Sequence, residues 1–241
     1  MGILDIFSGS GPQKAQKLKA KVTQKYGDAA ARQKAISQLG EMKFPEAISV
    51  LLARFTISVE PQTTDADEKE HVFELICSHG SEAVGPAKEF LHKSDLATSW
   101  AIRILSSVLP EPEVIGIVTE LLGKLGATYT RNPEKKEVLL GFVEDKDDPR
   151  IAPAALPFLE DMSDDVKISA LKVLGPKKFE PAREPILKLL TAEETARRVR
   201  TAALAALHAS EFGIQGFREK VEAVLQDPYF VDKAGAVKKR G

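Results

Sequence analysis

Residues 164–175 read DDVKISALKVLG, and residues 197–207 read RRVRTAALAAL. When Val166 is aligned with Val199, thirty-three residues apart, both stretches carry alanine four places later and leucine five places later. Self-similarity at a period of this length is typical of proteins built by stacking one supersecondary unit on the next. The chain is therefore expected to consist of repeats, and the repeat has to be defined before any residue is given a chemical role.

The same spacing recurs upstream, anchored at Ala31, Glu68, Ala97 and Lys135. Five and eight places after the six anchors stand only large apolar residues: Ile36, Phe73, Ile102, Leu140, Leu171 and Leu204, then Leu39, Ile76, Leu105, Val143, Leu174 and Leu207. Four places after the anchors the residues are Ala35, Val72, Ala101, Leu139, Ala170 and Ala203. These positions share one helix face, and small residues there favour close approach of a neighbouring helix.

A second apolar segment follows each of these helices, and it often has a proline near its start, as in PEAISVLLARF and PEVIGIVTELLGKL. Proline is well tolerated in the first turn of a helix. The anchors lie 37, 29, 38, 31 and 33 residues apart, which suits helix pairs joined by loops of different length. The pattern predicts an all-α fold, a right-handed α-solenoid of about six helix pairs over residues 28–228. Residues 1–27 are expected to form an apolar tip, a flexible linker and a basic helix, and residues 229–241 a basic tail whose end, VKKRG, is disordered.

The residue directly after the anchor is basic in five of the six repeats: Arg32, Lys69, Lys136, Lys167 and Arg200, with Thr98 in the third. Together with the small residue four places in and the proline-started partner helix, this pattern resembles the HEAT-repeat family, in particular its bacterial relatives of the phycobilisome-lyase type. The resemblance implies that these five basic residues form a structural ladder by bonding to loop groups of adjacent repeats. Thr98 departs from the pattern, so the ladder is expected to be interrupted there.

Composition excludes several classes of protein. Cys77 is the single cysteine, which rules out an internal disulfide, and no run of apolar residues approaches the roughly 20 needed to cross a bilayer. No signal peptide opens the sequence, so a cytoplasmic location is expected. The net charge of −1 hides an asymmetry, because residues 1–34 hold seven basic groups against Asp5 and Asp28. The rest of the chain is net acidic, so no nucleic-acid partner is expected.

The residue types that could form a catalytic or metal site do not occur in the required patterns. A family of HEAT-repeat hydroxylases binds iron through His-Glu pairs, but glutamate follows none of the four histidines, His71, His79, His92 and His208. Cys77 lies two places from His79, which points the two side chains to different sides of a helix. No metal, cofactor or catalytic residue is therefore predicted. Trp100 is interpreted either as an exposed aromatic contact for a partner or as packing between repeats.

The N-terminus departs most from the repeats. MGILDIF is followed by SGSGP and then by QKAQKLKAKVTQKYG, which holds Lys14, Lys17, Lys19, Lys21 and Lys25 and no acidic residue. An apolar tip followed by a basic helix is typical of contact with a membrane surface or an acidic partner. The myristoylation pattern is not met, since Ile6 stands where serine or threonine is required. The alternative is a capping helix that covers the first repeat.

From these observations we expect a non-enzymatic scaffold or adaptor that holds another protein on the concave face or rim of the solenoid. Trp100, Lys14, Lys17 and Lys21 are the expected partner contacts, with a weak membrane-surface contact through the N-terminus. The alternative is an enzyme on the same fold, such as a DNA glycosylase or a bilin lyase. An enzyme requires a deep pocket with converging titratable groups, whereas a scaffold requires a broad, shallow groove.

Overall fold

A computed structural model of the protein describes residues 11–240. The chain divides into two compact units, residues up to Val114 and residues from Ile115 onward. The division falls inside one helix, α7 (Glu111–Leu125). Each unit has its own arrangement of helices.

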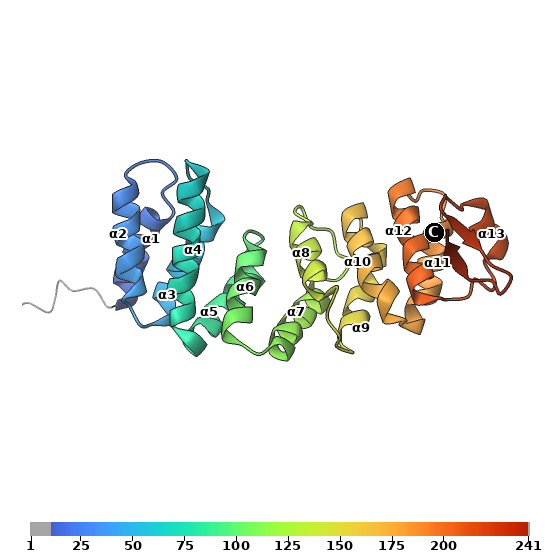
Figure 1. Ribbon diagram of the computed structural model, residues 1–241. Coiled ribbons are helices and arrows are strands. Elements are labelled where there is room, and N and C mark those ends of the chain that lie inside the picture. Colours follow the sequence, from blue (N-terminus) through green and yellow to red (C-terminus); the bar gives the residue numbers. More distant parts are fainter. Residues whose placement is uncertain (1–10, 241) are drawn as a thin grey trace, which may run out of the picture. The chain divides into compact units, whose positions relative to one another are not determined.

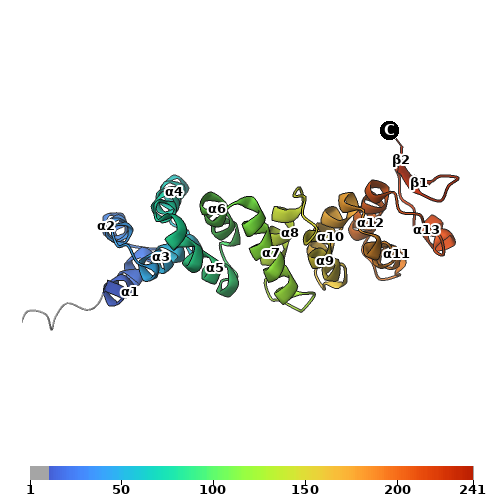
Figure 2. The same cartoon turned by 90° about the horizontal axis from the view of Figure 1, so that it is seen from below.

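Unit 1 contains α1 (Gly11–Val22), α2 (Ala29–Gly40), α3 (Pro45–Leu52) with the 3₁₀ turn η2 (Ala53–Thr56), α4 (Gln62–Ser78), the turn η3 (Gly80–Ala83), α5 (Val84–Lys93), α6 (Thr98–Val108) and the start of α7. Helix α4 packs against both α2 and α6, while α3 packs against α5 (Figure 1). In the view of Figure 2, α2, α4 and α6 form one layer, and α3 and α5 form the other. Helix α1 lies against α2 and α3.

Local sequence explains where several of these helices begin. The carboxylate of Asp28 accepts a hydrogen bond from the backbone N–H of Ala30 at 2.9 Å and caps α2. Pro45 occupies the first turn of α3, where its missing N–H costs nothing. Asp65, which stands at the corresponding place before its anchor, is not a cap, because α4 already begins at Gln62. Its carboxylate is used instead in a tertiary network.

Unit 2 contains the rest of α7, α8 (Glu134–Val143), α9 (Ile151–Ala155) with η4 (Leu156–Glu160), α10 (Asp164–Lys177), η5 (Glu180–Ala182) with α11 (Arg183–Thr191), α12 (Arg197–Ser210) and α13 (Arg218–Ala223). Helix α10 packs between α8 and α12. At Gly175 a Cβ would come within 2.9 Å of the Cα of Ala206, so only glycine permits this approach of α10 to α12. These are the two helices whose sequences repeat each other.

The repeat positions read from the sequence form the cores of the two units. Of the twelve large apolar residues, only Phe73 is half-buried, and the other eleven are buried. The residues four places after the anchors are all at most 1% exposed. The prediction of an all-α solenoid is confirmed, because the described residues form successive helix pairs with strands only at the C-terminal end.

The C-terminal segment differs from the expected disordered tail. Strands β1 (Tyr229–Val231) and β2 (Val237–Lys239) form an antiparallel hairpin beside α12. Tyr229 and Val237 are buried, and the Val237 carbonyl lies 3.3 Å from Nδ1 of His208 on α12. The expectation of disorder was wrong because it considered only the basic residues Lys238, Lys239 and Arg240. The buried apolar residues of the hairpin lie against α12.

Candidate functional site

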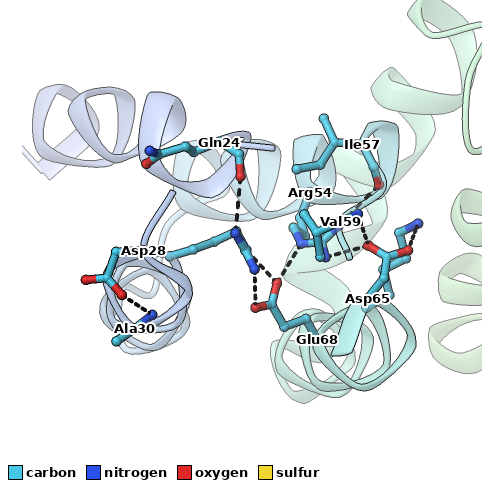
Figure 3. A network of polar contacts seen from close by, with 10 residues as sticks. Gln24, Asp28, Ala30, Arg54, Ile57, Val59, Asp65 and Glu68 are labelled. Atoms are coloured by element: carbon cyan, nitrogen blue, oxygen red, sulfur yellow. Dashed lines mark hydrogen bonds and ion pairs between the residues drawn. The ribbon is translucent and has the colours of Figure 1, made fainter. Parts of the chain in front are cut away.

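The predicted ladder begins with a buried ionic network in unit 1 (Figure 3). Arg32 on α2 donates to both carboxylate oxygens of Glu68 on α4, at 2.7 and 2.9 Å, and to the carbonyl of Gln24 at 3.2 Å. Both side chains are nearly inaccessible, with 3% and 5% exposed. Lys69, the next predicted ladder residue, instead donates to Asp65 one turn earlier on its own helix. Arg32 therefore joins two repeats, whereas Lys69 does not.

Arg54 on η2 is the member of this network that the sequence analysis missed. Its fully buried guanidinium donates to Glu68 at 3.0 Å, to Asp65 at 2.7 Å and to the carbonyl of Ile57 at 3.2 Å. The available signal was an arginine inside the apolar segment AISVLLARF, since an isolated cation among core residues requires buried partners. Each carboxylate of the network is thereby shared between two cations.

The network keeps its carboxylates ionised. Burial opposes ionisation of Glu68, but the hydrogen bonds from Arg32 and Arg54 outweigh it and hold the pKa of Glu68 below its ordinary value. Burial likewise opposes ionisation of Asp65, and Lys69, Arg54 and the Val59 N–H together lower its pKa. The bond to Glu68 raises the pKa of Arg32. Three cations, Arg32, Arg54 and Lys69, engage the two carboxylates, so the network is suited to joining helices rather than to proton transfer.

In unit 2 the ladder residues behave differently from one another. Lys136, 1% exposed, donates to the Thr128 carbonyl at 2.6 Å and to Asp161 at 2.5 Å. Arg200 donates to the carbonyls of Ala192 and Glu193 at 2.9 and 3.0 Å. The side chain of Lys167 makes no hydrogen bond or ion pair with any residue that the structure describes. The same sequence position thus has three different environments.

The expected partner contacts lie at two separate places in unit 1. Trp100 on α6 is half-buried and stacks on Phe55, with ring centroids 4.6 Å apart, while the guanidinium of Arg103 lies 5.0 Å from its ring. Lys14, Lys17 and Lys21 are exposed on α1. The structure does not bring these residues together into one surface.

Unit 2 holds a cavity of about 820 Å³ whose wall carries six titratable side chains. We call it the acid-lined cavity. It lies between the loop that joins α8 to α9 and the C-terminal end of α10, and its walls are Glu144, Asp145, Lys146, Asp147, Asp148, Pro149, Ala152, Pro176, Lys177 and Phe179. Its volume falls in the range of small-molecule sites.

Lys177, the last residue of α10, is held at the wall of this cavity by backbone groups. Its Nζ donates to the carbonyl of Lys146 at 2.7 Å and to that of Glu144 at 3.2 Å. Burial lowers the pKa of Lys177, and the nearby carboxylates of Asp147, Asp145 and Glu144 oppose this only in part. Two carbonyls accept the two N–H bonds of a neutral amine, which leaves its lone pair free.

The carboxylates of the cavity divide into engaged and available groups. Asp148 accepts two bonds from the Arg150 guanidinium and one from the Arg150 N–H, which lower its pKa to about 2. Asp145 lies 3.7 Å from Nζ of Lys146. Glu144 and Asp147 pair with no cation in the described part of the chain. The cavity therefore combines a lysine of lowered pKa with two carboxylates, those of Glu144 and Asp147, that form no ion pair among the described residues.

This site was not predicted from the sequence. The signal is weak: an acidic run, EDKDD at 144–148, and a lysine that follows it by about one repeat period. Helical repeats place corresponding loops side by side, which brings the end of α10 to the loop before α9. Among residues 11–240, no group of three or more His, Cys, Asp or Glu side chains is arranged to hold a metal ion, and no helix is both long and apolar enough to cross a membrane.

Comparison with known proteins gives one coarse link. No family model matches the chain, and no curated protein matches it. The solved structure of human deoxyhypusine hydroxylase in complex with glycerol is similar over 90% of this chain and 91% of that one, at 14% identity and a TM-score of 0.38. That protein is helical and contains HEAT repeats, which links the chain to HEAT-like folds. The link is coarse, because the similarity is low.

This finding corrects the expected function. The chain was predicted to be a non-enzymatic scaffold, whereas the similar solved structure is that of an enzyme, which fits the enzyme alternative better. The non-enzymatic assignment is therefore withdrawn. At this degree of similarity, neither substrate nor mechanism carries over to the chain.

Proposed function

We propose that the protein is a HEAT-like enzyme whose reactive group is the amine of Lys177 in the acid-lined cavity, and that its substrate is a small carbonyl compound without negative charge. The observation that carries this proposal is the position of Nζ, which faces two backbone carbonyls at the wall of a cavity of about 820 Å³. Lysines of this kind serve as nucleophiles when burial keeps part of their population neutral.

The reaction class follows from the chemistry of an amine beside carboxylates. The lone pair of Nζ adds to the carbonyl carbon of the substrate, and the carbonyl oxygen takes up a proton to give a carbinolamine. Loss of water then yields an imine, so that amine and carbonyl compound become imine and water. Asp147 and Glu144 line the same cavity and can deliver and remove the protons that these steps require.

The lining also selects the substrate by charge. The acidic residues Glu144, Asp145, Asp147 and Asp148 outnumber the basic residues Lys146 and Lys177, so an anionic compound is repelled. Phe179 and the prolines Pro149 and Pro176 supply an apolar wall for the uncharged part of the substrate. The same charge opposes a nucleic-acid backbone, which weighs against a glycosylase.

The test is reductive trapping on the full chain. The protein is incubated with sodium cyanoborohydride and one of three aldehydes, cationic betaine aldehyde, neutral propanal or anionic glyoxylate, and labelled lysines are located by peptide mass spectrometry. Lys172, exposed on the same helix, is the internal control. We expect Lys177 to be labelled faster than Lys172, fastest by betaine aldehyde and slowest by glyoxylate, and Lys177→Arg to lose this label alone. Equal labelling of the two lysines would contradict a special role for Lys177.

A further inference from the structure

Helix α1 has one face committed to the fold and another that is not. Ala15 and Val22 are fully buried against α2 and α3, which holds α1 in place as a cap on the first helix pair. Lys14, Lys17 and Lys21 recur at helical spacing of three and four residues, so they share a single exposed stripe. The fold therefore fixes the orientation of this stripe without using it.

The stripe lacks compensating charge. Residues 11–27 contain no acidic side chain, and Lys14, Lys17, Lys19 and Lys21 form no ion pair with any part of the chain that the structure describes. Like charges three and four residues apart destabilise a helix. A stripe that weakens its own helix and contributes nothing to the core is explained by an external anionic partner.

An exposed aromatic residue adjoins this charge. Tyr26, just beyond α1, is 79% exposed, and Nζ of Lys25 lies 5.5 Å from its ring centroid. Tyrosine is enriched at the interface between lipid headgroups and acyl chains, where the ring is partly buried and the hydroxyl stays hydrated. Lysines beside an interfacial aromatic residue are the composition of a membrane-surface contact.

We propose that the lysine stripe of α1, together with Lys25 and Tyr26, docks the protein on an anionic lipid bilayer. Charge complementarity argues for this occupant: a bilayer surface offers many negative headgroups in a plane, which a single convex helix can contact along its length. A nucleic acid is less suited, because the segment from Gly11 to Gly27 holds lysine but no arginine, the residue favoured for bidentate phosphate contacts. The sequence before α1 also supplies Ile3, Leu4, Ile6 and Phe7, which lie outside the described residues.

Docking through α1 does not involve the acid-lined cavity. The expected loss of vesicle binding follows from the number of lysines removed. One lysine near an anionic surface strengthens binding about fivefold at physiological ionic strength, so removal of three should weaken it about a hundredfold. Reversal of the charges should weaken it further. The effect should shrink as salt rises, because the headgroup potential falls off within about one Debye length.

The experiment is co-sedimentation of the full chain with vesicles. Phosphatidylcholine vesicles with and without 30% phosphatidylserine (a chosen composition of about one anionic lipid in three) are compared at low and physiological salt. The variant Lys14→Glu/Lys17→Glu/Lys21→Glu is compared with a control of equal charge change, Lys172→Glu/Lys220→Glu/Lys233→Glu, whose lysines are exposed and outside both proposed sites. Tyr26→Ala tests the aromatic contribution. Thermal melts followed by circular dichroism establish that each variant is folded.

The expected result is binding of the wild type to anionic vesicles only, retained within a few-fold by the control variant and lost by at least about a hundredfold in the stripe variant. Tyr26→Ala should weaken binding at both salt concentrations. The proposal is overturned if the wild type does not bind anionic vesicles at low salt, or if both triple variants lose binding equally. It is also overturned if duplex DNA displaces the protein from the vesicles and if DNA binding requires the same lysines. That outcome would assign the stripe to nucleic acid.

Discussion

The buried network around Glu68 offers the sharpest test of how the repeats are joined. Glu68→Gln keeps the shape of the side chain but removes the charge that receives two hydrogen bonds from Arg32 and one from Arg54. Arg54 retains the carboxylate of Asp65 at 2.7 Å, whereas Arg32 is left with neutral acceptors, the carbonyl of Gln24 and the new amide oxygen. Since Arg32 is 3% exposed, water cannot replace the lost carboxylate.

The structure sets the size of the effect. Removal of one partner from a buried ion pair costs about 3–5 kcal/mol, because the remaining charge stays buried without compensation. We therefore expect Glu68→Gln to lower the free energy of unfolding by about that amount at neutral pH. Addition of Arg32→Met should restore part of the loss, because no unpaired guanidinium then remains.

The pH dependence carries a second signature. A carboxylate whose pKa is lowered in the folded protein stabilises it above the unfolded pKa, and this stability is lost as pH falls through the folded pKa. Glu68 and Asp65 both have lowered pKa values, so the wild type should lose stability in the acid range below the ordinary carboxylate pKa. Glu68→Gln should show a shallower decline, since only Asp65 of the pair still titrates.

The assay is equilibrium unfolding in urea, followed by circular dichroism from neutral to acid pH. Glu70→Gln is the matched control, because Glu70 lies on the same helix and receives two bonds from Arg103, at 2.7 and 2.6 Å, but both side chains are 45% exposed. The control should change stability far less than Glu68→Gln does. Equal effects of the two substitutions, or an unchanged acid limb in Glu68→Gln, would refute the argument that burial makes this network important.

Three further predictions concern unit 2. Arg200→Ala should lower the free energy of unfolding by about 1–2 kcal/mol, because two loop carbonyls lose their hydrogen bonds. Lys167→Ala should be near neutral, because the Lys167 side chain has no partner among the described residues. Urea midpoints that fall equally in both variants would contradict this contrast. Leu171→Ala and Leu204→Ala should each cost about 2–5 kcal/mol in the same measurement, since the side chains are 1% and 0% exposed. Truncation after Asp227 should lower the melting temperature and increase binding of a hydrophobic dye, because loss of the buried Tyr229 and Val237 uncovers α12. An unchanged melting temperature would mean that the hairpin does not stabilise the fold.

The sequence alone determined the helix pairs and their core. The positions four, five and eight places after each anchor form one helical face by the geometry of the α-helix, whatever surrounds them, so Ala170, Leu171 and Leu174 could be placed in the core from spacing alone. The cap at Asp28 was equally local, since its acceptor and donor lie two residues apart. Such features depend only on residues that are close in the chain, so they can be predicted from the sequence.

Only the tertiary structure decided what the polar residues do. Lys136 and Lys167 occupy the same repeat position, yet Lys136 meets Asp161, whereas the side chain of Lys167 meets no partner within residues 11–240. Loops of different length put different groups before each helix. Arg54 became part of the buried network, and Lys177 reached the acid-lined cavity, through contacts between successive repeats. The pairing and burial of a charge depend on groups that are distant in sequence, and the repeat period places helices without specifying which loop atoms face them.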